Sequence, residues 1–215
     1  MIRSIQEIIY SIPAILLAFT FHSYAKARMA DKLGDRTPRM QGRLNLNPLT
    51  HIDPIGTLLI VVFGIGWAKP VETDPRAYKN FYKDDLKVSL AGPLATLGVA
   101  FVASIVLAIL NIIAFKFNIV GTIMFVIIQM TKYVISINVS LFVFYLLPLP
   151  GLDGFNIFRD LSPKNFYKYA EPMLRNQFLI LIAIILLAGP IIRIPANLIL
   201  DVLSWFIHLI ITVIL

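Results

Sequence analysis

Three polar side chains stand close together inside an apolar stretch near the start of the chain. His22, Ser23 and Lys26 lie within FTFHSYAKARMADKLGD, residues 19–35. The apolar pattern of residues 5–27 predicts a membrane-length helix that carries all three. A lone histidine on such a helix is more often a core residue than a metal ligand. Its role therefore depends on what the rest of the chain brings to it.

Ser23 and Lys26 alone allow one kind of chemistry. Their spacing is that of Ser-x-x-Lys hydrolases, in which a neutral lysine helps to activate the serine. Burial would favour the neutral amine, whereas a nearby ionised carboxylate would favour the ammonium form. No oxyanion hole is evident in the sequence, so this dyad is a minor alternative.

A carboxylate far along the chain is the strongest candidate partner. Asp153 lies in FYLLPLPGLDG, residues 144–154. The prolines and glycines there predict a break in an apolar span, which would let Asp153 point inward. The simpler interpretation is that Asp153 is only a turn residue.

The elements that must position these residues are membrane spans. Hydrophobic residues make up 58% of the 215 residues, and the mean hydropathy is +0.81, more than a water-soluble domain can cover. Runs long enough to cross a bilayer are 5–27, 88–115, 119–147, 176–192 and 196–215. We predict an all-α polytopic membrane protein with about five transmembrane helices. We expect one domain over 1–215, with its core in 5–158 and C-terminal helices in 176–215.

A polar segment between the first two spans has a different pattern. In GRLNLNPLTHIDPIG, residues 42–56, leucine alternates with polar residues between prolines, which predicts short strands. The apolar run at 56–66 is too short to cross and predicts a re-entrant or interfacial piece. We therefore expect a small β or re-entrant element on the cytoplasmic side.

The basic residues predict which side of the membrane these loops occupy. Fourteen lysines and arginines fall in residues 28–87 and 159–175, against three at Arg3, Lys116 and Arg193. The positive-inside rule then places the polar loops in the cytoplasm, the N-terminus outside and the C-terminus inside. Topology explains the net charge of +7 better than nucleic-acid binding does. The chain has no cysteine, so disulfides and thiolate metal sites are excluded.

Four separated motifs together resemble one family. They are FTFHSYAKARMADKLGD, then TPRMQGRLNLNPLTHIDPIGT with GWAKPV, then SLAGPLATL, and finally FYLLPLPGLDG. Their order and spacing resemble the site-2 protease family of intramembrane zinc metalloproteases, in its short bacterial form without a PDZ domain. The resemblance covers residues 13–158 and implies a multi-pass protein of a bacterial plasma membrane.

The resemblance implies a site with two changed positions. Family members carry His-Glu-x-x-His on the first span, where two histidines bind zinc and the glutamate activates water, and Leu-Asp-Gly supplies a third ligand. His22 and Asp153 stand at ligand positions. Ser23 stands where the glutamate belongs, and Lys26 where the second histidine belongs. We expect His22 and Asp153 to be a vestigial metal site.

Further positions carry over from the same resemblance. Thr96 and Tyr145 stand where the family has asparagines thought to hold substrate or developing charge, and we include Asn138 with them as substrate-binding. His51 could be proposed as a replacement zinc ligand. Family members, however, have a histidine in that context beside a complete zinc site.

The changed site leads to a hypothesis about Lys26. A protonated lysine has no lone pair for zinc, and the two remaining ligands are fewer than the three of a typical catalytic zinc. A carboxylate within the bilayer costs about 3 kcal/mol unless it is protonated or paired. We hypothesise that the Lys26 ammonium replaces zinc and pairs with Asp153. The alternative is that Lys26 only extends to the membrane surface.

The resemblance then implies two functions of different classes. The first is a catalytically inactive homologue that binds transmembrane segments or regulates an active relative, with no cofactor. The alternative is an active intramembrane metalloendopeptidase with an altered metal site, which would need zinc. The expected partners are the lipid bilayer and a membrane protein or transmembrane segment.

Overall fold

Helices make up nearly all of the regular structure. The computed structural model describes residues 4–63 and 67–215, and for 60–63, 178 and 181–188 it describes the backbone alone. The four long helices are α1 (Ile5–Lys32), α5 (Phe81–Lys116), α6 (Thr122–Tyr145) and α9 (Gln177–Ile214). The shorter ones are α2 (Thr37–Met40), α3 (Pro48–His51), α4 (Pro54–Phe63), the 3₁₀ turn η1 (Pro75–Ala77), α7 (Asp153–Leu161) and α8 (Pro163–Arg175).

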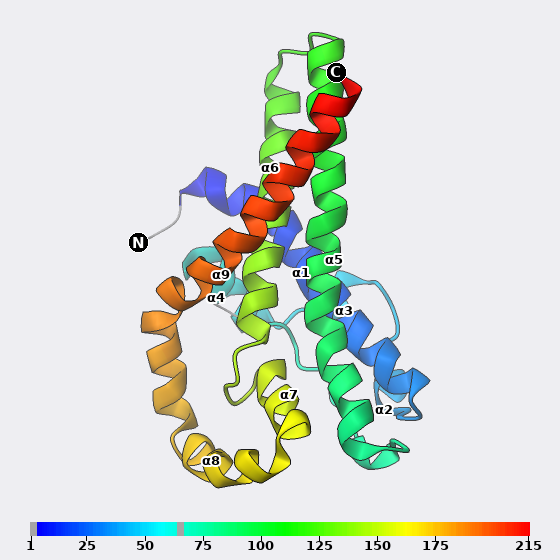
Figure 1. Ribbon diagram of the computed structural model, residues 1–215, viewed down its shortest axis with the longest axis vertical. Coiled ribbons are helices and arrows are strands. Elements are labelled where there is room, and N and C mark those ends of the chain that lie inside the picture. The colour runs from blue at the N-terminus through cyan, green and yellow to red at the C-terminus, as the bar shows by residue number, and fades with distance from the viewer. Residues whose placement is uncertain (1–3, 64–66) are drawn as a thin grey trace.

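The long helices pack around one apolar core. α5 and α6 run side by side, α1 crosses them, and α9 lies along both (Figure 1). Small residues let the backbones approach closely: Ala14 of α1, Ala100 of α5 and Ala196 of α9 are buried in the same cluster as Val139 of α6. The bundle thus fixes α1, which carries the first candidate residues, against α5 and α6.

The number of candidate spans differs from the prediction. Among the described residues, four helices are long and apolar enough to cross a membrane: Ile5–Lys32, Phe81–Lys116, Thr122–Tyr145 and Gly189–Ile214. The two spans predicted at 176–192 and 196–215 belong to one continuous helix, α9. Pro190 and Pro195 lie inside α9, which bends without ending (Figure 1).

The predicted strands are also absent from the part of the chain that the structure describes. Residues 43–47 form turns instead, because Asn45 and Asn47 accept hydrogen bonds from nearby backbone N–H groups and start the short helix α3. The run at 56–66 contributes to the ten-residue helix α4, which is too short to cross, while residues 64–66 lie outside the described residues.

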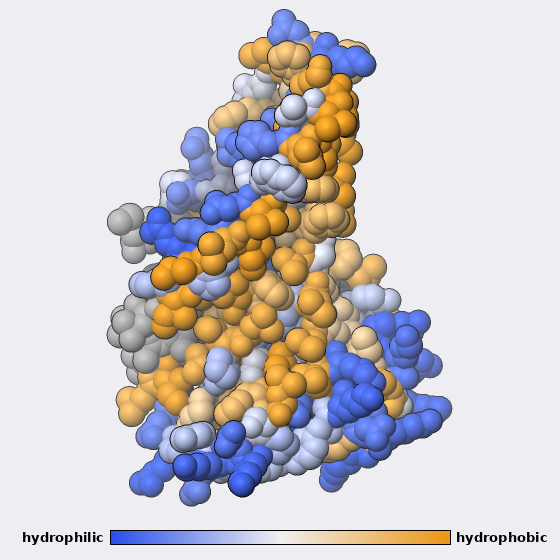
Figure 2. Space-filling view, viewed as in Figure 1, coloured by the Kyte–Doolittle hydropathy of each residue, from blue (hydrophilic) through white to orange (hydrophobic). Residues whose placement is uncertain are grey.

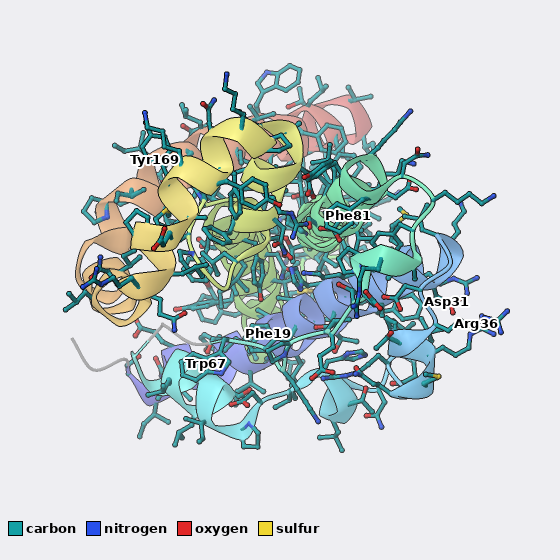
Figure 3. The ribbon with its side chains drawn as sticks, turned by 90° about the horizontal axis from the view of Figure 1, so that it is seen from below. Phe19, Asp31, Arg36, Trp67, Phe81 and Tyr169 are labelled. Carbon is teal, nitrogen blue, oxygen red and sulfur yellow. The ribbon has the colours of Figure 1, made fainter. Side chains whose placement is uncertain are left out.

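The surface agrees with a membrane location for the long helices. Apolar residues cover the middle of the molecule, and hydrophilic residues gather at the end that holds α7 and α8 (Figure 2). Viewed from that end, Asp31 and Arg36 lie at the periphery, and Tyr169 points outward from α8 (Figure 3). The fold is therefore an all-α polytopic membrane protein.

Candidate functional site

α1 places two of the candidate residues on one face. His22 and Lys26 are four residues apart, so one helical turn brings both side chains to the same side. Only 7% of His22 and 1% of Ser23 is exposed. The site is thus built well inside the bundle, although Lys26 keeps part of its side chain open.

The PLPGLDG segment brings Asp153 to that face. α6 ends at Tyr145 and α7 begins at Asp153, which confirms the predicted break and leaves Asp153 3% exposed. Gly151 has a φ of +90°, a conformation that favours glycine. A Cβ on Gly154 would lie 2.3 Å from the Leu146 carbonyl oxygen, so only glycine lets the start of α7 lie so close to the turn that follows α6.

Asp153 binds both α1 side chains. The His22 Nε2 atom lies 2.7 Å from one carboxylate oxygen of Asp153. The Lys26 ammonium donates a hydrogen bond to the other carboxylate oxygen and forms an ion pair with it. The predicted Lys26–Asp153 contact is therefore confirmed, and both oxygens of the carboxylate are engaged.

Two neighbours hold the His22 ring in this position. Tyr145 stacks on the ring, with centroids 3.8 Å apart and planes inclined by 20°. On α5, a Cβ added to Gly92 would lie 2.5 Å from the His22 Nε2 atom. The glycine of SLAGPLATL is therefore required for the close approach of α5 to the histidine, a role that the sequence motif did not reveal.

An extended strap closes one side of the site. A cavity of about 200 Å³ is lined by His22, Ser23, Lys26, Tyr145, Gly151, Leu152, Asp153 and the strap residues Trp67–Val71. The strap is tied down where the Lys69 N–H donates to the His51 carbonyl (3.0 Å) and Arg43 donates to the Pro70 carbonyl (2.9 Å). The strap residues belong to the GWAKPV motif. That motif contributed to the family resemblance but did not reveal that these residues line the cavity.

Other predicted residues lie outside this cavity. Thr96 is fully buried, and its hydroxyl donates to the Pro93 carbonyl of the same helix. Asn138 is fully buried and donates to the Val134 carbonyl in α6. The His51 ring Nε2 lies 2.8 Å from the Asn45 carbonyl oxygen in the polar segment. Their proposed binding roles therefore remain predictions, and only Tyr145 of the three substrate-binding candidates reaches the cavity.

Ser23 lines the cavity, but Lys26 is engaged elsewhere. The hydrogen bond of the Lys26 ammonium goes to Asp153. A carboxylate partner stabilises the ammonium form, which has no lone pair to accept a proton from Ser23. This contact argues against the serine–lysine dyad.

The donor set can be tested against zinc. His22 and Asp153 offer ligand atoms, but the third side chain of the cluster is Lys26, and an ammonium is not a ligand. Across residues 4–63 and 67–215, no three His, Asp or Glu side chains lie close enough to share a metal ion. Two ligands fall short of the three or four that zinc takes in proteins, so the residues present do not fit a zinc site.

An arginine network fixes the helix that carries Asp153. Arg159, in α7, forms ion pairs with Asp85 of α5 and with Asp160, where its Nε lies 2.9 Å from the carboxylate. Its guanidinium also lies over the Phe81 ring, 5.2 Å from the centroid. The polar end of α5 therefore anchors α7 two turns beyond Asp153.

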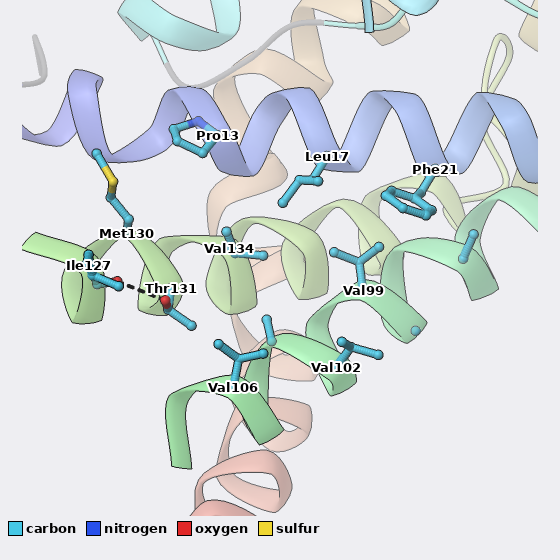
Figure 4. Close-up of a pocket in the computed structure, with 13 residues that line it drawn as sticks. Pro13, Leu17, Phe21, Val99, Val102, Val106, Ile127, Met130, Thr131 and Val134 are labelled. Atoms are coloured by element: carbon cyan, nitrogen blue, oxygen red, sulfur yellow. Dashed lines mark hydrogen bonds between the residues drawn. The ribbon is translucent and has the colours of Figure 1, made fainter. Parts of the chain in front are cut away.

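An apolar groove lies on the other side of α1. It has a volume of about 730 Å³ and lies between α1, α5 and α6, with Pro13, Leu17 and Phe21 on one wall and Val99, Val102 and Val106 on another (Figure 4). Phe21 directly precedes His22 in the sequence. The lining suits a purely apolar occupant such as an acyl chain or an apolar helix segment.

Together, the bundle of candidate spans and the buried His–Lys–Asp cluster define a polytopic membrane protein with a polar site inside its helical bundle. The chain is 40% identical over 154 residues to "Putative zinc metalloprotease YwhC" of Bacillus subtilis (strain 168), an alignment that covers 72% of this chain and 69% of that protein. The chain therefore belongs to that family of site-2-protease-like membrane metalloproteases. No family model and no solved structure matches it.

Proposed function

We propose that this chain is a noncatalytic member of its family that binds membrane-spanning segments or regulates an active relative. One observation carries the proposal: both oxygens of Asp153 are engaged by His22 and Lys26. An ammonium takes the position of a divalent cation, so the site would hold no metal to activate water. Ser23 replaces the acidic residue that such a mechanism would use as its base.

The bound segment is assigned to the apolar groove between α1, α5 and α6. The groove opens between three candidate spans, and its α1 wall ends one residue before His22. A segment lying there would be apolar and helical, because backbone polar groups inside a bilayer must be satisfied within the segment itself. Binding would then need no chemistry at Asp153.

Restoring the family residues tests the proposal. Wild-type protein, purified without chelator, is expected to hold less than about 0.1 zinc per chain, and Ser23→Glu/Lys26→His to gain zinc toward one per chain, since it restores a third ligand. Metal analysis by mass spectrometry measures the zinc content of both proteins. The matched control is Ser23→Glu/Lys32→His, which places the new histidine on an exposed position of α1.

Stoichiometric zinc in the wild-type protein, with cleavage of a membrane segment that a chelator stops, would overturn the proposal. It would favour the second candidate, an active intramembrane metalloendopeptidase. One observation favours that alternative: the relative that is 40% identical is named a zinc metalloprotease. It would require a further ligand that the described residues do not place beside His22 and Asp153.

A further inference from the structure

A line of polar side chains runs along the exposed side of α9. Arg193, Asn197, Asp201, Ser204 and His208 follow one another at intervals of four, four, three and four residues, which places them on one stripe of a helix. All five are exposed. We call these five residues the α9 polar stripe.

This stripe lies where lipid would be expected. α9 contains the candidate span Gly189–Ile214, and Asp201 stands at its middle. α9 packs inward through Ala196 and Leu203, which lie on a different side of the helix from the stripe, and the five stripe residues stay exposed. Figure 2 shows the surface over α9 as apolar with hydrophilic side chains interrupting it.

Asp201, at the centre of the stripe, is the residue whose placement in the bilayer is least favourable in free energy. An aspartate at the middle of a membrane helix is strongly unfavourable unless it is paired. Among the described residues, no hydrogen bond or ion pair engages the side chain of Asp201 or of any other stripe residue. Arg193 lies about 12 Å away along the helix axis, near the end of the span, where a long side chain reaches the membrane surface.

A second copy of the chain would not satisfy this stripe. Two copies in one membrane share a topology, so a two-fold axis along the membrane normal places identical residues at the same depth. Asp201 would then face Asp201, and Arg193 would face Arg193. Charge complementarity instead requires a different helix, with a basic or donor side chain at mid-depth.

We propose that the α9 polar stripe is a docking surface for a membrane-spanning helix of another protein that carries a lysine, arginine or amide side chain at the level of Asp201. The surface lies on α9, apart from the Lys26–Asp153 site, so it does not rest on the proposed function. It selects its partner by a polar contact inside the bilayer, where such contacts stabilise helix pairs.

Synthetic membrane helices test this directly. The probes are Leu/Ala peptides of about 23 residues, a length that spans a bilayer, with Lys, Asn, Asp or Leu at the centre and a dansyl acceptor. The full chain in lipid nanodiscs carries Trp67→Phe, which leaves Trp205 as the only one of the two tryptophans. Energy transfer from Trp205, one residue after Ser204, then reports docking on α9 itself.

The Lys-centred peptide is expected to dock about tenfold more tightly than the Leu-centred one, with Asn between them and Asp no better than Leu. Asp201→Leu should abolish this preference. The control Val202→Leu alters an exposed apolar position of the same helix and should preserve it. Lys26→Met should also preserve it, which separates this surface from the site on α1.

Three results would overturn the proposal. The first is equal docking of all four peptides, or a preference that survives Asp201→Leu. The second is energy transfer between labelled copies of the chain that Asp201→Leu removes, which would make the stripe a contact between copies. The third is quenching of Trp205 by lipids brominated near the headgroup but not by lipids brominated deep in the acyl chain, which would place the stripe outside the hydrocarbon.

Discussion

Lys26 is the residue that decides the chemistry of the site. Its position in the sequence resembles that of a zinc ligand in the family motif, and its ammonium is paired with Asp153. Once paired, the carboxylate is neutralised without a metal, and the cation comes from the helix itself. We propose that this single side chain supplies the site with its own cation in place of a bound metal ion.

This pair should show energetic coupling. Lys26→Met removes one partner of a largely buried pair, and the free energy of unfolding should fall by about 3 kcal/mol. Lys26→Met/Asp153→Leu should lose less than the sum of the two single variants, because neither charge is then left alone. Thermal unfolding in detergent micelles measures the cycle. Lys32→Met, on the exposed part of α1, is the control. If the losses of unfolding free energy in the two single variants simply add up in the double variant, the pairing is contradicted.

Gly92 is predicted to matter through the space it leaves for His22. Gly92→Ala places a methyl group 2.5 Å from the His22 Nε2 atom, and the resulting overpacking should cost about 1–3 kcal/mol of unfolding free energy. Gly98→Ala on the same helix meets nothing within 4 Å. It should be neutral or stabilising by about 0.5–1 kcal/mol, since alanine favours helices. Equal effects of the two changes would contradict this account of Gly92.

At the scale of elements, α7 is the helix that sets the position of Asp153. Its N-terminus follows the PLPG turn, and Arg159 ties its middle to Asp85 on α5. The positive end of the α7 dipole also favours a carboxylate at its first residue. A charged network outside the cavity therefore positions a residue inside it.

The same network predicts a pH dependence. Burial, helped by the nearby Asp85 carboxylate, raises the pKa of Asp160 from 3.8 to about 6 despite Arg159. Between these two values the native state holds more protons than the unfolded state, so the free energy of unfolding should decrease as the pH rises through this window. The contribution is on the order of 2 kcal/mol.

Comparing wild type with Asp160→Asn isolates this contribution, because other acidic residues give slopes of the opposite sign. Asp74, for example, has a pKa lowered by hydrogen bonds from Arg76. The difference between the two unfolding profiles should change between about pH 4 and 6. A difference that is flat across that range would refute the assignment.

At the scale of the whole molecule, the described part of the chain contains four candidate spans, whereas about five were predicted. An even number of crossings places both ends of the chain on the same side of the membrane. The C-terminus lies at the end of the molecule where α5 and α6 are connected, opposite α7 and α8 (Figure 1). We therefore propose that both termini lie outside, with the basic loops in the cytoplasm.

Reporter fusions distinguish this arrangement from the five-span topology. Alkaline phosphatase fused after Leu215 should be active, because it folds only outside the cytoplasm, and a green fluorescent protein fused there should stay dark. Fusions within the loop near residue 162 should give the reverse pattern. Fluorescence from the C-terminal fusion would instead place the C-terminus in the cytoplasm and contradict this arrangement.

Much of this protein could be predicted from its sequence. Hydropathy identified the long helices, since a bilayer demands about 20 consecutive apolar residues and an internally bonded backbone. The spacing of His22 and Lys26 placed both on one helical face, and the PLPGLDG turn predicted the break before Asp153. These inferences succeeded because they depend on local geometry alone.

Only the tertiary structure decided the remaining features. The spans predicted at 176–192 and 196–215 form one helix that continues through Pro190 and Pro195. Thr96 and Asn138 turned toward their own helices, and the strap at 67–71 reached the cavity, because long-range packing decides which faces meet. The sequence thus named the residues that could pair, and the packing of both α1 and α7 against α5 determined that Lys26, His22 and Asp153 meet.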